Sequence, residues 1–322
     1  MGYDGESMQM SKELTKREKR KIKFELLKNE VKANKVFYFM LAPFLIIFLT
    51  FTVIPVVMSF GLSFTSYDLF QSPKFVGLSN YLALFLQDDI FLIALRNTFI
   101  LAIITGPVSY LLAFVFAWII NELPSKIRWV MTLIFYAPSI SGNVFLLWAL
   151  IFSSDIYGYL NSFLMRLNII DTPILWLQTP KYSLIILIIV QLWLSLGVTF
   201  LSFVAGLKTV DKTLYEAAAI DGLRNRWQEL WYITLPQMKP QLMFGAVMQI
   251  TTALGISTVS LQLLGNPSVE YSGHTIVTHL LDYGPGSTRM EMGYASAIAV
   301  ILFIIMVGAN LLVQKLLRRV GT

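Results

Sequence analysis

Cysteine is absent from this sequence, so the chain can form neither a disulfide framework nor a thiolate metal site. Histidine occurs only at His274 and His279, in one late loop, where we expect ordinary loop positions rather than metal ligands. No combination of Cys, His and paired buried carboxylates is available for catalysis. The sequence therefore predicts no metal site and no enzyme active site.

Charge is scarce as well. Asp, Glu, Lys and Arg make up 14% of the 322 residues, whereas soluble domains usually carry about 25%. Six segments contain no charged residue and no histidine, and each is long enough for a helix of roughly 20 residues to cross a bilayer. They are Val36–Gly61, Asn97–Asn121, Trp129–Ser153, Tyr182–Leu207, Gln241–Gly265 and Met292–Gln314. The sequence thus predicts an all-α membrane protein with six transmembrane helices in residues 36–322, after a tail of residues 1–35.

The basic residues are distributed unevenly along the chain. Most of the 25 Lys and Arg residues lie in the tail, in the segments after the second and fourth charge-free stretches, and at the C-terminus. The positive-inside rule therefore predicts that both termini and the loop of residues 208–240 are cytoplasmic. The tail is either a basic amphipathic helix on the membrane surface or a solvated segment. Because the positive charge lies beside helix ends, we expect the lipid bilayer and no nucleic acid as its partner.

The charge-free spans limit how transport could be driven. Proton relays and ion-coupled pumps usually carry an acidic residue or a histidine inside the membrane, and the six spans carry none. A sodium site built from carbonyls and hydroxyls remains open. The G-x-x-x-x-G-K-[ST] motif of an ATPase phosphate loop is also absent. The chain is therefore either a passive pore or a transporter whose energy comes from a partner.

The loop of residues 208–240 carries signals for a short helix. Asp211 suits the N-cap position, and Gly222 suits the left-handed residue that follows a helix end. Between them, residues 217–219 are all alanine, so another backbone could approach this surface closely. Glu216 and Asp221 would supply negative charge to Arg or Lys of a partner. On these grounds alone, a cytoplasmic helical hairpin without a partner remains equally open.

Glu216-Ala217-Ala218, Asp221-Gly222 and Leu235-Pro236 together resemble the EAA loop of binding-protein-dependent ABC importer permeases. In that family the loop forms a coupling helix that docks in a cleft of the ATPase subunit. The resemblance implies the six-helix, MetI-like permease fold. It assigns the ATPase-coupling role to Tyr215, Glu216, Ala217, Ala218, Ala219, Asp221 and Gly222.

Other segments resemble the carbohydrate-uptake branch of this family, the maltose- and glycerol-phosphate-type permeases. They include Asn80-Tyr81, Arg96-Asn97-Thr98 and Gly293-Tyr294-Ala295. Gly265-Asn266-Pro267 departs from the pattern, because the family often has Gly-Gly-Pro there, and this weakens assignment to one class of sugar.

The resemblance implies a permease subunit that forms half of the pathway for a sugar or oligosaccharide. The implied partners are a second homologous permease, two ATPase subunits that bind ATP and Mg²⁺, and an extracellular or periplasmic solute-binding protein. The chain itself would bind no cofactor, and it would lie in the plasma membrane of a bacterium or archaeon. One alternative is a glycerol-phosphate-type or polyanionic sugar as cargo. Another is a membrane scaffold or sensor subunit that does not transport.

Neutral polar and aromatic side chains occur within the third, fourth and fifth spans. The candidates for contact with the solute are Tyr136, Asn143, Gln191, Trp193, Gln249 and Thr252. Amides, hydroxyls and flat rings suit a neutral polyhydroxylated solute. The same groups also join membrane helices to one another, so each candidate has a purely structural alternative.

Overall fold

The computed structural model describes residues 16–142 and 144–317, and nearly all of its regular structure is helical. The chain divides into two compact units, with the boundary after Met58. The first unit contains α2 (Lys16–Ala33), α3 (Lys35–Phe48), a π-helical segment (Leu49–Val53) and the start of α4 (Ile54–Leu62). Helix α2 covers much of the basic tail, so the described part of this tail is helical.

The second unit begins with short elements and continues with long apolar helices. Strands β1 (Thr65–Ser66) and β2 (Lys74–Phe75) pair antiparallel. The helices before the predicted coupling loop are α5 (Ser79–Leu86), α6 (Asp89–Asn121), α7 (Ser125–Ile140), α8 (Phe145–Ile151), α9 (Tyr159–Arg166), α10 (Pro180–Leu194) and α11 (Gly197–Thr209).

The coupling loop and the C-terminal helices complete the second unit. The loop contains α12 (Lys212–Ile220), α13 (Arg226–Glu229), a π-helical segment (Leu230–Thr234) and α14 (Leu235–Gln237). It is followed by α15 (Lys239–Leu254), α16 (Thr258–Leu264), a 3₁₀ turn (Val269–Tyr271), α17 (Ile276–Tyr283) and α18 (Met292–Leu317).

Membrane-length apolar helices account for the charge-free segments. Five spans are long and apolar enough to cross a bilayer: Lys35–Leu62, Asp89–Asn121, Pro180–Thr209, Lys239–Leu264 and Met292–Leu317. The third charge-free segment is covered by α7 and α8, which are bent by 86° and give a sixth span if counted together. The prediction of an all-α membrane protein is thus confirmed, and its six spans are obtained when α7 and α8 are counted together.

The core of the second unit lies between α6, α11 and α15. Phe200 and Phe203 of α11 are fully buried, and the Phe203 ring packs edge-on against Tyr110 and Phe114 of α6. Gly245 of α15 faces the same ring, where an added Cβ would come within 2.7 Å of it. A small residue at this position therefore lets α15 approach α11 closely, as is typical of helix packing in membranes.

A serine from a neighbouring helix stabilises the break between α10 and α11. Ser139 of α7 accepts a hydrogen bond from the Gly197 amide at 3.0 Å and donates one to the Leu194 carbonyl at 3.3 Å. Ser195, at the break, is hydrogen-bonded to Ser109 of α6. Inside a bilayer no water can satisfy the backbone groups that a break releases, so neighbouring helices must do so. The irregular backbone is therefore a built feature of this span.

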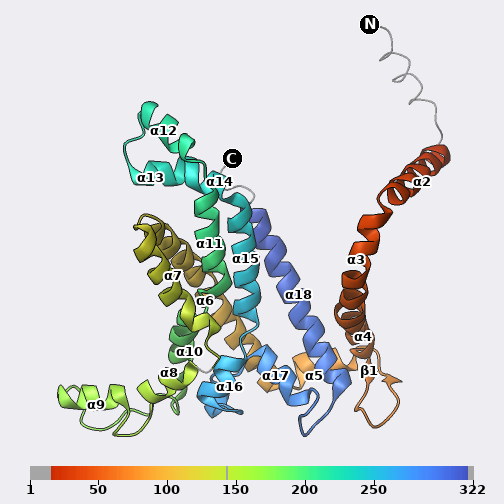
Figure 1. Ribbon diagram of the computed structural model, residues 1–322. Coiled ribbons are helices and arrows are strands. Elements are labelled where there is room, and N and C mark those ends of the chain that lie inside the picture. The colour runs from red at the N-terminus through yellow and green to blue at the C-terminus, as the bar shows by residue number, and fades with distance from the viewer. Residues whose placement is uncertain (1–15, 143, 318–322) are drawn as a thin grey trace, which may run out of the picture. The chain divides into compact units, whose positions relative to one another are not determined.

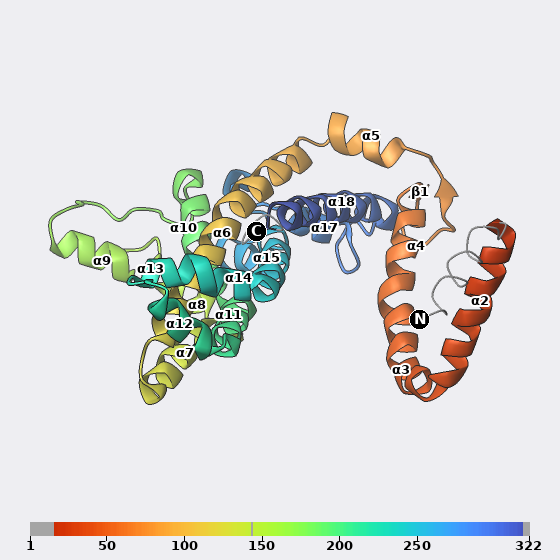
Figure 2. The same cartoon turned by 90° about the horizontal axis from the view of Figure 1, so that it is seen from above.

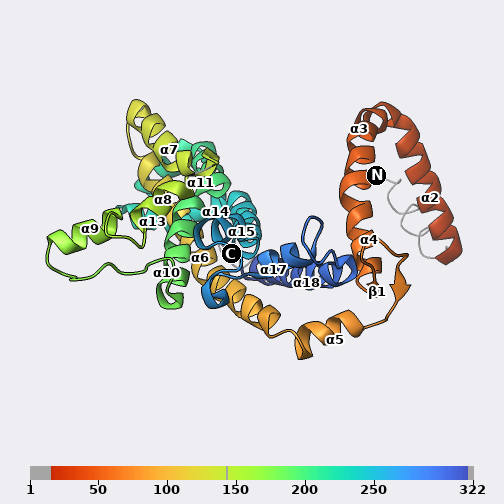
Figure 3. The same ribbon diagram turned by 90° about the horizontal axis from the view of Figure 1, so that it is seen from below.

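The two ends of the second unit carry different elements. Figure 1 shows α12 and α13 at one end and α5, α16 and α17 at the other. Helix α9 projects sideways from the helix cluster, as the views from above and below also show (Figure 2, Figure 3). Because the long helices run between these two ends, the coupling loop (residues 208–240) and α17 lie at opposite ends of this unit.

Candidate functional site

Helix α12 has both of the ends that its sequence predicts. The Asp211 carboxylate accepts a hydrogen bond from the Thr213 amide at 2.9 Å, and this bond lowers the pKa of Asp211. At the other end Gly222 has a φ of +94°. The Leu223 amide bonds to the Ala218 carbonyl at 2.9 Å, and the Gly222 amide to the Ala219 carbonyl at 3.3 Å. These two bonds form a Schellman motif, which fixes where the helix ends.

One face of α12 is attached to the protein and the other is exposed. Tyr215 and Ala218 are partly buried against the core cluster, which also includes Leu207 and Leu230. Glu216, Ala217, Ala219 and Asp221 are all exposed. The exposed face thus combines small side chains with two carboxylates, an arrangement that allows a partner's backbone to come close.

Ile220 extends the exposed face of α12 with an apolar side chain. It is 88% exposed at the last position of the helix. Removing such an apolar side chain from water lowers the free energy, so its burial would favour the binding of a partner.

Side-chain contacts connect α12 to the segment before α15, and α13 to the end of α6. The Tyr215 hydroxyl lies 2.8 Å from the Thr234 hydroxyl, in the segment that leads into α15. Arg226 forms ion pairs with Glu229 at 2.7 Å and with Glu122, just after α6, at 3.1 Å. Through these contacts a displacement of the loop would reach both α6 and α15.

An aromatic pair adds to the attachment of α13. The rings of Trp227 and Trp118 lie 5.4 Å apart, and Trp118 is part of α6. This contact is apolar and so is not weakened by salt, unlike the exposed ion pairs of Arg226.

The pathway candidates do not surround one cavity within the described residues. Gln191 and Gln249 are buried, Tyr136 and Trp193 are partly buried, and Thr252 is exposed and donates to the Met248 carbonyl of its own helix. Asn143 lies outside the described residues. The Trp193 ring packs edge-on against Trp148 of α8. The predicted set is therefore spread over three spans, and none of these contacts by itself marks a route for solute.

Gln249 has the most distinctive surroundings of the candidates. Its side-chain oxygen accepts a hydrogen bond from Thr199 of α11 at 3.3 Å, while its side-chain nitrogen is buried without a partner among the described residues. It also borders an apolar cavity of about 520 Å³ that is lined by residues of α6, α15 and α18. Sequence reasoning could not identify Thr199 as its partner, because the two residues meet only when α11 packs on α15.

Two histidines occupy a position that the sequence analysis did not expect. His274 and His279 are each 2% exposed, and they lie in a polar cluster with Asp282 and Asp88. They are buried cluster members rather than ordinary loop residues. Spacing gave a weak signal, since two histidines five residues apart are followed by an aspartate three residues later.

Comparison with known proteins agrees with the helical architecture. The chain is 36% identical to the probable ABC transporter permease protein YesP of Bacillus subtilis, over 85% of this chain and 87% of that protein. It is 32% identical to the arabinooligosaccharides transport system permease protein AraP of the same organism, over 87% of each chain.

A solved structure is similar over almost its full length. It is a chain of a bacterial ABC transporter involved in the import of the acidic polysaccharide alginate, with a TM-score of 0.71 and 26% identity, covering 92% of this chain and 99% of that one. The same fold recurs in the complex of the alginate transporter with an alginate pentasaccharide-bound periplasmic protein, with a TM-score of 0.70. Residues 99–322 match the sequence pattern of the binding-protein-dependent transport system inner membrane components, and the chain belongs to this family.

Proposed function

We propose that this chain is one permease subunit of an ATP-driven importer and forms half of the pathway for a sugar or oligosaccharide. The observation that carries the proposal is α12. It is a capped helix that exposes a face of small and acidic side chains and is connected by Tyr215 to the segment before α15. The relatives of this chain include permeases named for arabinooligosaccharides and for lactose transport.

In this proposal α12 docks on an ATPase subunit. Glu216 and Asp221 would pair with basic groups of that partner, and Ala217 and Ala219 would permit close contact. The complete importer would contain a second homologous permease, two ATPase subunits and a solute-binding protein. ATP and Mg²⁺ would be bound by the ATPase subunits, and hydrolysis would take place there.

The orientation follows from the same assignment. If α12 meets the ATPase, its end of the second unit is cytoplasmic, together with the end of α18. The end that carries α16 and α17 then faces the binding protein. Such a chain would be a multi-pass protein of the bacterial or archaeal plasma membrane with both termini in the cytoplasm, as the basic residues predict.

The polar side chains of the spans favour a neutral sugar as cargo. Their polar groups are amides and hydroxyls, such as those of Gln191, Gln249 and Thr252, which can replace the water bound to a neutral sugar. Leaving one polar group of the solute without a hydrogen bond costs roughly 1–3 kcal/mol. The similarity to a transporter of an acidic polysaccharide favours a second candidate, a polyanionic sugar.

The proposal is tested by reconstituting the chain with its partner permease, ATPase and binding protein in liposomes. We expect ATP hydrolysis to rise when the binding protein carries its sugar. The sugar should then cross the liposome membrane from the side of the binding protein to the side of the ATPase. A neutral arabino-oligosaccharide and an alginate oligosaccharide of equal length distinguish the two cargo classes. A scaffold or sensor subunit would give no uptake with either sugar, and that outcome would refute the proposal.

A further inference from the structure

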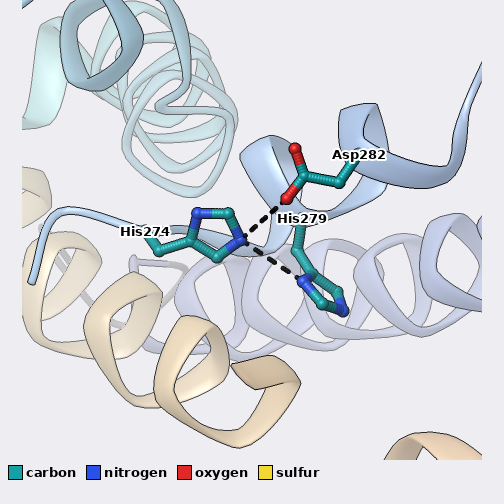
Figure 4. Close-up of side chains that lie close together, drawn as sticks. All are labelled: His274, His279 and Asp282. Atoms are coloured by element: carbon teal, nitrogen blue, oxygen red, sulfur yellow. Dashed lines mark hydrogen bonds and ion pairs between the residues drawn. The ribbon is translucent and has the colours of Figure 1, made fainter. Parts of the chain in front are cut away.

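Three potential metal ligands converge beside α17, on the face opposite the coupling loop. Figure 4 shows the His274 ring pointing toward both His279 and Asp282. His274 Nε2 lies 3.3 Å from His279 Nδ1 and 3.4 Å from Asp282 Oδ2. The three ligand atoms all lie within 4.8 Å of one another.

These separations match the spacing of ligands around a small metal ion. In a tetrahedral zinc site with bonds of about 2.0–2.1 Å, neighbouring ligand atoms are separated by about 3.3–3.4 Å. The two distances from His274 Nε2 equal such an edge. The third pair, His279 Nδ1 and Asp282 Oδ2, lies within 4.8 Å. A zinc ion would therefore fit between the three atoms after a small movement that gives this pair the same separation.

The remaining polar atoms of the three side chains are already engaged. His279 Nε2 lies 3.0 Å from Asp88 Oδ2, and His274 Nδ1 lies 3.2 Å from Thr278 Oγ1. Asn266 donates to Asp282 Oδ1 at 2.6 Å, which leaves Oδ2 turned toward His274. In metal-binding histidines the second ring nitrogen typically donates a hydrogen bond to a carboxylate or another oxygen, as these contacts allow.

Asp88 sets the tautomer of His279. Burial alone would raise the pKa of Asp88, but hydrogen bonds from the Phe91 amide and Tyr294, together with the interaction with His279, outweigh it and lower the pKa. Asp88 already accepts hydrogen bonds from the Phe91 amide and the Tyr294 hydroxyl, and with His279 Nε2 as a further donor the proton of the neutral ring lies on Nε2. In the neutral ring Nδ1 then presents its lone pair to His274 and Asp282, as a metal ligand must.

From this geometry we propose that His274 Nε2, His279 Nδ1 and Asp282 Oδ2 form a zinc-binding site. Imidazole with one carboxylate is a ligand set that suits Zn²⁺. The proposal is independent of the transport cycle and goes beyond the function proposed above.

The electrostatic surroundings are compatible with a divalent cation. Burial disfavours the charged form of the His274 ring and lowers its pKa to about 4. The carboxylates of Asp88 and Asp282 are close by. Arg289 is the opposing positive charge, and its guanidinium stacks 4.6 Å from the centre of the Tyr283 ring.

A fourth ligand position would face a cavity. His279 and Asp282 line a cavity of about 590 Å³, together with Asn266, Tyr271 and Arg289. Water from this cavity can complete the tetrahedron. The bound ion would join His274, just before α17, to His279 and Asp282 within that helix, and it would fix the α17 segment against Asp88 at the start of α6.

The composition of the chain makes the test direct. Because there is no cysteine and no third histidine, every histidine-ligated metal bound by the chain must use His274 or His279. The full chain is purified in detergent through a tag free of histidine. Zn²⁺ is then titrated against a chromophoric chelator, and Co²⁺ is added separately to record the visible spectrum of a tetrahedral site.

We expect one Zn²⁺ per chain and an intense tetrahedral Co²⁺ spectrum. His279→Ala should weaken zinc binding more than 100-fold, and Asp88→Asn, which changes the partner of His279 Nε2 and none of the three ligands, by about 10–100-fold. Asp282→Asn is the ligand variant that should disturb folding least, because this side chain is 28% exposed. Glu270→Gln, an exposed acid in the same segment, is the matched control and should bind zinc as the native chain does.

A second measurement guards against misfolded variants. Zinc should raise the unfolding temperature of the native chain and of Glu270→Gln, and it should leave that of Asp282→Asn nearly unchanged. Equal zinc affinity in the native chain and in folded Asp282→Asn and His279→Ala would overturn the proposal. So would the absence of stoichiometric binding to the native chain. Either result would mean that hydrogen bonds alone hold the cluster, with His274 Nε2 donating to His279 and Asp282.

Discussion

The hydroxyl groups of Tyr215 and Thr234 lie 2.8 Å apart and connect α12 to the segment that leads into α15. Thr234 is buried in a π-helical turn and also lies 3.3 Å from the Glu229 carbonyl. The contact therefore joins α12, most of whose residues are exposed, to a buried residue of the segment before α15. If a partner docks on α12, as we propose, a push on α12 would reach the segment before α15 through this contact.

Tyr215→Phe removes this contact and keeps the ring. The lost hydrogen bond should destabilise the coupling loop by about 0.5–1.5 kcal/mol. We expect the substrate-dependent stimulation of ATP hydrolysis to fall severalfold in the reconstituted importer, with the amount of subunit in the membrane unchanged. Tyr232→Phe is the control, because Tyr232 is 73% exposed in the same loop. Equal stimulation in both variants would show that the hydroxyl contact does not transmit movement.

Gly222→Val should abolish transport while the subunit still reaches the membrane. The position has open space around it, so no atom obstructs a side chain, but its φ of +94° is strained for any residue with a Cβ and most of all for a β-branched one. The strain, of roughly 1–2 kcal/mol, should change how α12 ends.

Gly286→Val is a close match for Gly222→Val, since Gly286 has a φ of +86° and equally open surroundings at the other end of the unit. It should retain the coupling of ATP hydrolysis to transport. Gly222→Asn should also retain most of it, because asparagine tolerates the left-handed region. Normal transport by Gly222→Val at native membrane levels would contradict the docking role of α12.

Gln249→Leu tests the solute pathway against interhelical packing. If Gln249 contacts solute, uptake should fall while basal ATP hydrolysis and assembly of the complex persist. If its bond to Thr199 mainly joins α11 to α15, assembly should be lost instead. Gln237→Leu, an exposed change in α14, controls for added apolar surface. Uptake is measured in proteoliposomes, and assembly is measured by size-exclusion chromatography of the complex.

The proposed orientation can be tested with single cysteines, because the chain has none of its own. Thr288→Cys and Lys212→Cys place a thiol at exposed positions on opposite ends of the second unit. In intact cells an impermeant maleimide should label Thr288→Cys and should reach Lys212→Cys only after the membrane is opened. Labelling of Lys212→Cys in intact cells would place α12 outside and would refute docking to a cytoplasmic ATPase.

Features that depend on local physics followed from the sequence. The spans could be predicted because a charge inside a bilayer is costly, so their limits are marked by where the charges stop. The ends of α12 could be predicted because capping by Asp211 and the left-handed turn at Gly222 involve only neighbouring residues. Both ends have the expected geometry.

The breaks within the spans and the contacts between helices were decided by tertiary structure. Ser139 satisfies the break beside Gly197 from 58 residues away in the chain, and Thr199 meets Gln249 across 50 residues. Asp88 and His279 are separated by 191 residues, and folding places them 3.0 Å apart. The local pattern of residues holds no record of such pairs, because they depend on how whole helices pack. The sequence therefore determined the membrane spans and the two ends of α12, whereas only packing placed His274 and His279 in a buried cluster with Asp282 and Asp88.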